Sequence, residues 1–288
     1  MKRTPILCPA GNETLVGTVH LPPDECPLPS DRIGILLLNA GPAPRAGNSD
    51  VPAHLADRLA ERGMLAFRFD LPGLGDSTGA SWPTIASYWA AAQRGCNDEA
   101  VVALVSFLCS RFSLRGLIVG GLCAGAICTL RCADAANEHF AGTLLLEPDL
   151  RIAAEERLAP TGAGWKPTPA AAQRLRRRLT RLRNLDEILT VLTGESRFAR
   201  PFRLVRPFLA RLLERRAGRV LPGDALLAAV HPWRRTLERG APSLVVTSED
   251  SGSHQYLSRI LPVFPASARR HVCQVVVPET NYLLTAGD

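Results

Sequence analysis

Continuous apolar runs and helical repeats alternate along much of the chain. Residues 33–39, IGILLLN, form an uninterrupted apolar run, which is typical of a strand buried on both faces. Residues 51–62 instead place Leu55 and Leu59 four positions apart, as a helix does, and Gly63 follows where a helix would end. The same patterns predict strands at 14–20, 65–70, 116–120, 142–148, 243–247 and 272–277, and helices at 96–112 and from residue 124 to about 136. This alternation predicts an α/β fold with a mostly parallel sheet flanked by helices.

The pattern changes between residues 151 and 235, where β-branched residues are few and Arg, Leu and Ala are many. Part of this stretch, AAAQRLRRRLTRLRNLDEILTVL, has helical spacing, with one stripe formed by Leu175, Leu179, Leu182, Leu185 and Leu189. We therefore predict a helical, Arg-rich lid insertion at 151–235 and a core formed by residues 1–150 and 236–288.

Positive charge is concentrated in this insertion. Residues 151–220 contain 17 Lys and Arg against 6 Asp and Glu, a balance of +11, so the rest of the chain carries −4 of the overall +7. The basic residues fit either a solvated helix face or attraction to an anionic substrate or an acidic partner. Aromatic residues are sparse here, at Trp165, Phe198, Phe202 and Phe208, so nucleic acid is not a predicted partner.

The hydrophobic segments are too short for a bilayer. The longest weakly polar run, 116–130, falls short of the roughly 20 residues that a membrane span needs, and glycines interrupt it. The first residues, MKRTPILCPAGNETLVG, lack the apolar core of a signal peptide. We expect a cytoplasmic protein without a membrane span.

Cysteine spacing points to neither disulfides nor a metal. The 288-residue chain has eight cysteines, and without a secretion signal we expect them to be reduced. There is no CxxC pair and no Cys/His cluster with metal-ligand spacing. The sequence also lacks GxxxxGK[ST] and a GxGxxG that follows a strand, so we predict no metal and no cofactor.

The stretch VGGLCAGA, residues 119–126, has the chemistry of a nucleophile elbow. Cys123 lies between a predicted strand and a predicted helix, where a sharp turn exposes a side chain at the carboxyl end of the sheet. Gly121 and Gly125 provide the small neighbours that such a turn requires. The helix N-terminus favours the thiolate form of a cysteine, and we expect Cys123 to be partly ionised. The alternative is an inert cysteine at a glycine-rich join.

With this elbow, the sequence resembles the α/β-hydrolase superfamily. LLLNAGPAPRAGN, residues 36–48, looks like its oxyanion loop, and RLAERGMLAFRFDLPGLGDSTG, residues 58–79, looks like its strand-four region. Together with GLC, these motifs are most similar to the exosortase-A-system-associated hydrolases, cytoplasmic enzymes of bacterial surface-polysaccharide gene clusters. The similarity covers roughly residues 5–150 and 240–285. It implies an α/β-hydrolase fold for the core and does not extend to the predicted lid.

The resemblance also implies residue roles. Cys123 is the nucleophile, and the backbone N–H of Ala124 holds the oxyanion together with that of Gly41 or Ala43, since Pro42 has no N–H. Asp250, in VVTSEDSGS, occupies the position of the acid, although a turn carboxylate there is the alternative. Glu147, at the end of TLLLEP, is a less favoured acid.

The histidine base of the family is missing from its position. The chain reads VVVPETNYLLTAGD, which places Tyr282 where the histidine belongs and leaves the usual final helix missing or truncated. Tyrosine, with an ordinary pKa near 10, is a poor base at pH 7. His254 is the nearest histidine in sequence, although it fits a surface helix better.

Three readings remain open. The first is acyl hydrolysis or acyl transfer on a small ester or thioester, including an anionic one linked to coenzyme A or a carrier protein. The second is elimination or cyclisation without a covalent step. The third is a catalytically impaired protein that binds a ligand or partner. The sequence does not specify an oligomeric state.

Overall fold

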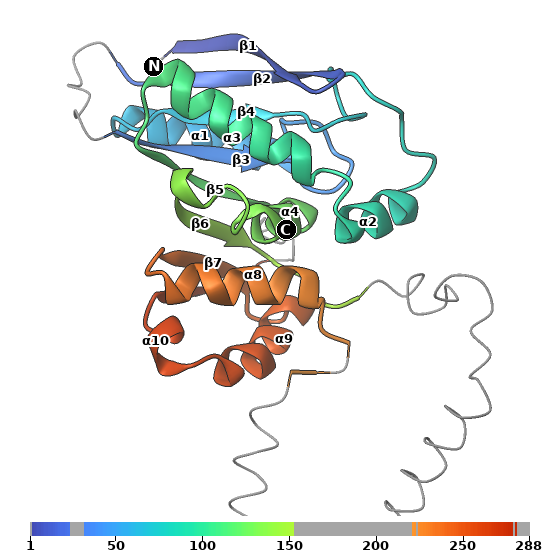
Figure 1. Ribbon diagram of the computed structural model, residues 1–288, viewed down its shortest axis with the longest axis vertical. Coiled ribbons are helices and arrows are strands. Elements are labelled where there is room, and N and C mark those ends of the chain that lie inside the picture. Colours follow the sequence, from blue (N-terminus) through green and yellow to red (C-terminus); the bar gives the residue numbers. More distant parts are fainter. Residues whose placement is uncertain (1, 24–31, 153–220, 223, 279, 281–288) are drawn as a thin grey trace, which may run out of the picture. The chain divides into compact units, whose positions relative to one another are not determined.

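The sheet contains eight strands, and all but two neighbouring pairs are parallel. The computed structural model describes residues 2–23, 32–152, 221–222, 224–278 and 280 (Figure 1). Its strand order is β1-β2-β4-β3-β5-β6-β7-β8, with β2 antiparallel to both β1 and β4. The strands are β1 (Lys2–Ala10), β2 (Glu13–Leu21), β3 (Ile33–Leu38), β4 (Ala66–Phe69), β5 (Gly116–Leu122), β6 (Phe140–Leu146), β7 (Ser243–Ser248) and β8 (Val272–Val277).

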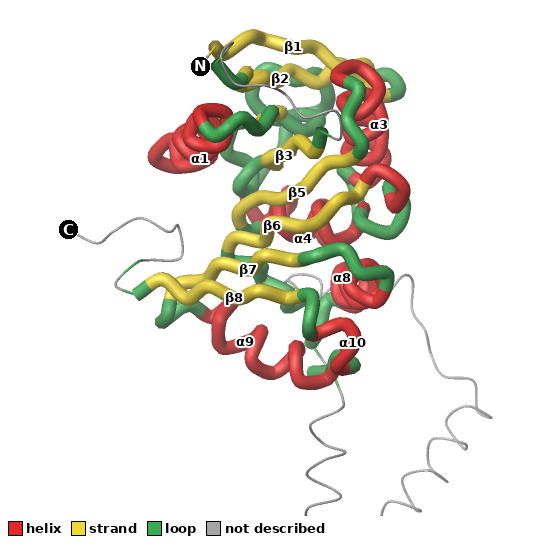
Figure 2. Tube along the Cα trace, turned by 90° about the vertical axis from the view of Figure 1, so that its left-hand side faces the viewer, coloured by secondary structure: helices red, strands yellow, loops and turns green. Residues whose placement is uncertain are grey.

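Helices cover the two faces of this sheet unequally. Figure 2 shows α1 (Val51–Glu61) on one side, and α3 (Asp98–Phe112), α4 (Ala124–Cys132) and α8 (Leu227–Glu238) on the other. The remaining helices are α2 (Ile85–Arg94), α9 (Gly252–Ile260) and α10 (Ala266–Arg269), with 3-10 turns at Asn48–Asp50, Asn137–His139 and Leu261–Val263. The predicted α/β-hydrolase fold is confirmed.

The apolar run at 33–39 behaves as its pattern predicts. Leu36 and Leu38 enter the cluster beneath α3, whereas Ile35 and Leu37 enter the cluster beside α1. Each predicted strand has a counterpart in the sheet. The first strand, β1, was not predicted, and it contains Pro5 and Pro9. Both prolines are tolerated because β1 is an edge strand.

The boundary between the predicted core and lid needs a correction. The described end of the 151–235 range includes α8, whose Trp233 is fully buried in one cluster with Leu130 of α4 and Val245 of β7. The core therefore resumes before residue 236, because α8 supplies the apolar layer over β7. Residues 153–220, with the predicted leucine stripe, lie outside the described residues.

A two-stranded stem closes this interval. Arg151 and Ala225 form an isolated antiparallel bridge. The N–H of Leu226 donates to the carbonyl of Leu150 at 2.8 Å, and the N–H of Ile152 donates to the carbonyl of Asp224 at 2.9 Å. The chain therefore leaves and re-enters the core at adjacent points. No helix within the described ranges combines the length and apolar character required to cross a membrane.

Candidate active site

Cys123 occupies the sharp turn between β5 and α4. Its backbone has φ 59° and ψ −111°, a strained combination for a residue with a side chain. Close packing forces the turn: a Cβ on Gly125 would lie 2.7 Å from the carbonyl oxygen of Asn39, and one on Gly121 would lie 2.8 Å from that of Leu38. Only glycine fits these two positions without a shift of β3. The elbow predicted from glycine spacing is therefore present in the backbone.

The predicted oxyanion donors differ in the contacts that the structure shows for their N–H groups. The N–H of Ala124 interacts with the sulfur of Cys123 and lowers the thiol pKa. Gly41 has φ 64°, and its N–H donates to no other described group, whereas the N–H of Ala43 donates to the carbonyl of Ala40 at 3.4 Å. Of the two loop candidates, only Ala43 has an N–H that is engaged within the described residues.

A buried carboxylate holds this loop. Asp70, fully buried after β4, accepts hydrogen bonds from the backbone N–H and the guanidinium of Arg45. It also accepts from the Asn39 side chain at 3.2 Å and from the N–H of Asp76 at 3.1 Å. Asn39 in turn donates to the carbonyl of Ala43 at 2.9 Å. The loop that carries Gly41 is thus tied to the end of β4.

A second set of polar contacts, centred on Arg68 and His20, supports the same loop. Arg68 donates to the carbonyl of Arg45 at 2.7 Å and to Nε2 of fully buried His20 at 3.0 Å. Nδ1 of His20 lies 2.7 Å from Asp57, which also pairs with Arg3. Burial lowers the pKa of His20, while the Arg3 hydrogen bond holds the pKa of Asp57 at about 2. His20 is therefore neutral at pH 7, as its role as an acceptor for Arg68 requires.

The surroundings of Cys123 disfavour its thiolate form. Burial raises its pKa to about 11, and the carboxylates of Asp149 and Glu147 act in the same direction. The expectation of a partly ionised thiol was wrong, because burial and two acidic neighbours outweigh the N–H groups of α4. The pattern of glycines carried no information about these two carboxylates.

Glu147 is the most unusual of these neighbours. It ends β6 with φ 44°, is 1% exposed, and accepts a hydrogen bond from the backbone N–H of Ser248 through Oε1. Its other oxygen, Oε2, is buried and has no hydrogen-bond partner among the described residues. Asp149 differs, since both its oxygens bind the guanidinium of Arg151, at 2.6 and 2.8 Å. Of these two neighbours of Cys123, Glu147 is the one with a carboxylate oxygen that no described residue binds.

Comparison with known proteins identifies the family. The family model described as "Alpha/beta hydrolase family" matches residues 35–284. The chain belongs to the alpha/beta hydrolase family.

Solved structures share the fold of this alpha/beta hydrolase at low sequence identity. It is similar to a proline iminopeptidase of Mycobacterium smegmatis, with 15% identity, TM-score 0.54, and coverage of 97% of this chain and 92% of that one. It is also similar to Est1E of Butyrivibrio proteoclasticus, bound to ferulic acid, with 10% identity, TM-score 0.53, and coverage of 97% of this chain and 91% of that one. A third similar structure is DcsB in complex with its substrate analogue, with 14% identity, TM-score 0.55, and coverage of 99% of this chain and 93% of that one. No curated protein matches the chain.

Of the other predicted side chains of this alpha/beta hydrolase, the structure describes Asp250 and His254. Asp250 follows β7 and is exposed, and no described residue contacts its carboxylate in a hydrogen bond or ion pair. His254 lies in the first turn of α9, with Nδ1 3.3 Å from the hydroxyl of Thr247. Tyr282 lies outside the described residues. Glu147, which sequence reasoning ranked below Asp250 as the acid, is buried, and its charge raises the pKa of Cys123.

The raised thiol pKa predicts a steep pH dependence of alkylation. The thiolate is the reactive form, and a pKa of about 11 leaves about one Cys123 in 10⁴ ionised at pH 7. Iodoacetamide labelling of Cys123 in this alpha/beta hydrolase should therefore rise about tenfold per pH unit from pH 7 to 10. Peptide mass spectrometry measures the rate, with exposed Cys273 as internal reference. A labelling midpoint below 8.5 would contradict it.

Proposed function

We propose that Cys123 is the nucleophile of an acyl hydrolase or acyltransferase that acts on a small ester or thioester. The backbone of Cys123 is the observation that supports this most strongly. Its positive φ is maintained by two glycine contacts against β3, and such strain persists where it serves a purpose. The purpose proposed is to present the sulfur beside the N–H groups of Ala124 and Gly41.

Attack by the sulfur of Cys123 on the acyl carbon forms a C–S bond. The thiol proton passes to the free oxygen of Glu147, and the N–H groups of Ala124 and Gly41 stabilise the negative oxygen of the tetrahedral intermediate. Collapse breaks the bond to the alcohol or thiol, which takes the proton from Glu147. Water or another acceptor then attacks the thioester, releasing the acyl group and restoring the thiol.

Glu147 serves in this proposal as the base that the family's histidine would provide. Glu147 suits the task because its charge acts on Cys123 and its Oε2 has no hydrogen-bond partner among the described residues, so that oxygen can accept the thiol proton as the sulfur attacks. We keep the prediction that three further residues act as an auxiliary acid or as hydrogen-bond donors: Asp250, Tyr282 and His254. The anionic substrate, the cytoplasmic location and the exosortase-associated subgroup, supported by NAGPAPR and GLC, also stay proposals.

The raised pKa of Cys123 favours a second candidate function. A protein whose thiol stays protonated at neutral pH would bind an ester or a partner without turning it over. This impaired reading and the enzymatic reading differ in one observable, the formation of an acyl group on Cys123.

The test is acyl-enzyme formation. Wild-type protein is mixed with p-nitrophenyl acetate and with acetyl coenzyme A, and intact and digested protein are weighed by mass spectrometry. We expect an acetyl group on Cys123 that hydroxylamine removes, and loss of hydrolysis by at least about 100-fold in Cys123→Ala. Exposed Cys96 gives a matched control, since Cys96→Ala should retain hydrolysis.

Two results would contradict the proposal. Hydrolysis that survives in Cys123→Ala would exclude this nucleophile. Absence of both the adduct and hydrolysis with esters and thioesters would leave the impaired, ligand-binding reading.

A further inference from the structure

His20 of β2 links the amino-terminal strands to the loop that carries Gly41. Its fully buried ring lies between Asp57 of α1 and Arg68 of β4. Nε2 accepts a hydrogen bond from Nε of Arg68 at 3.0 Å, so this nitrogen carries no proton. Nδ1, which lies 2.7 Å from the Asp57 carboxylate, therefore carries the proton and donates it in that contact. The two contacts together define one tautomer of a neutral ring.

The guanidinium of Arg68 connects this ring to the loop. Its Nε binds His20, and its Nη1 donates to the backbone carbonyl of Arg45 at 2.7 Å. Arg68 is only 6% exposed, so a donor that loses its acceptor there does not gain a water molecule without a shift of the surroundings. Because one rigid, planar group makes both hydrogen bonds, the position of the Arg45 carbonyl depends on the lone pair of His20.

The charged groups around His20 oppose a second proton on its ring. Strand β2 packs against β1, β4 and α1, and the charged groups that act on His20 from these elements are Arg3, Arg68 and Asp57. Burial lowers the pKa of His20, the hydrogen bond to Asp57 opposes that effect, and Arg68 and Arg3 lower the pKa further. The pKa of Asp57 is about 2, so its carboxylate keeps its charge where His20 titrates. His20 is therefore protonated only below the ordinary histidine pKa of about 6.5.

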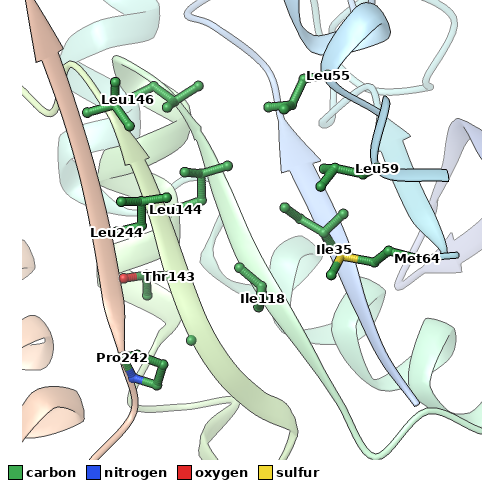
Figure 3. Close-up of a pocket in the computed structure, with 12 residues that line it drawn as sticks. Ile35, Leu55, Leu59, Met64, Ile118, Thr143, Leu144, Leu146, Pro242 and Leu244 are labelled. Carbon is green, nitrogen blue, oxygen red and sulfur yellow. The ribbon is translucent and has the colours of Figure 1, made fainter. Parts of the chain in front are cut away.

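The helix α1 keeps the Asp57 carboxylate in place. Leu55 and Leu59 of this helix pack against the cluster that includes Ile35 of β3 (Figure 3). A proton on Nε2 of the buried ring would set two N–H donors and two positive charges against each other. Since α1 is packed on the sheet, the group that has to give way is the Arg68 side chain.

We propose that His20 and Arg68 are positioning residues for the loop that carries Gly41, and that protonation of His20 at acidic pH releases this loop. Nε2 of His20 gains one proton from water, and its hydrogen bond from Nε of Arg68 breaks. The guanidinium turns away and withdraws Nη1 from the carbonyl of Arg45. The catalytic use of the loop rests on the proposed function, but release of the loop requires no reaction.

The first measurement is amide hydrogen exchange of the loop, which needs no substrate. After correction for the intrinsic exchange rate, protection of a peptide spanning residues 40–48 should fall about tenfold from about pH 7.5 to about pH 5 in the wild type. In His20→Gln the amide oxygen can accept from Arg68 but does not titrate, so protection should change by less than about twofold. His231→Gln is the matched control: His231 is exposed on α8, and this variant should behave as the wild type does.

The second measurement connects the loop to turnover. For p-nitrophenyl acetate, kcat of the wild type is divided by kcat of His20→Gln at each pH, because ionisation of Cys123 and Glu147 affects both proteins alike. This ratio should fall about tenfold from about pH 7.5 to about pH 5, while the KM ratio changes by less than about twofold, since the oxyanion exists only beyond the ground state. Arg68→Lys keeps the charge but not the two-donor fork, and should lower kcat about tenfold at about pH 7.5.

The exchange profile of the wild type decides the inference. Constant protection of the loop over this pH range, or an equal fall in His20→Gln, would overturn it whether or not any ester is hydrolysed. A fall of the same size in peptides of β5 would mean acid unfolding rather than release of the loop, and the inference would again be wrong. Release that depends on His20, in a protein that hydrolyses no ester, would support the inference and contradict the proposed function.

Discussion

Replacing Asp70 with alanine should lower the free energy of unfolding by about 3 kcal/mol, because breaking a buried ion pair leaves its partners uncompensated. Asp70 is fully buried and accepts hydrogen bonds from Arg45, Asn39 and the N–H of Asp76. In the variant these donor groups would lose the acceptor that they share. The loop that carries Gly41 would also lose its attachment to the end of β4. Urea unfolding followed by tryptophan fluorescence measures the change.

Asp76→Ala provides the control for this variant. Asp76 pairs with the same guanidinium at 2.7 Å, but its side chain is 68% exposed. An exposed pair contributes at most about 1 kcal/mol. If the two variants lose equal free energy of unfolding, the burial of Asp70 does not make its ion pair with Arg45 more stabilising than the exposed pair with Asp76, and the prediction is wrong.

Glu147→Gln should have opposite effects on thiol reactivity and on turnover. Removing the charge beside Cys123 lowers the thiol pKa, so alkylation at pH 8 should accelerate severalfold. Turnover of p-nitrophenyl acetate should nevertheless fall about 100-fold, since glutamine cannot accept the thiol proton. The amide keeps an oxygen for the N–H of Ser248, so the fold should persist.

Asp149→Asn separates charge from proton transfer. Asp149 also raises the pKa of Cys123, but both its oxygens are bound by Arg151. Its replacement should accelerate alkylation without the loss of turnover. Should Glu147→Gln speed up both processes, Glu147 only disfavours the thiolate, and another group must take the proton.

Local signals in the sequence predicted the sheet and the elbow. The apolar run of β3 and the spacing of Gly121 and Gly125 around Cys123 each express a constraint within a few residues. The sequence could not reveal pairs such as Arg45 with Asp70, 25 positions apart, or His20 with Asp57, 37 apart. Their partners are chosen by strand order rather than by spacing.

The error about the thiol has the same origin. Helix N-termini can be predicted from sequence, and the N–H of Ala124 does lower the pKa of Cys123. The acidic neighbours, Glu147 and Asp149, follow β6, and the pairing of β5 with β6 brings them alongside Cys123. The α8 boundary was missed because its apolar face completes a cluster shared with α4, and that cluster exists only after folding.

The stem formed by Leu150, Arg151, Ala225 and Leu226 has an evolutionary consequence. Because its two backbone segments pair with each other, the chain between them starts and finishes at one place on the core. Adjacent ends of this kind are where insertions are tolerated, since new sequence need not alter the packing below. The interval can therefore diversify in length and charge while the pairing of β6 with β7 stays constant.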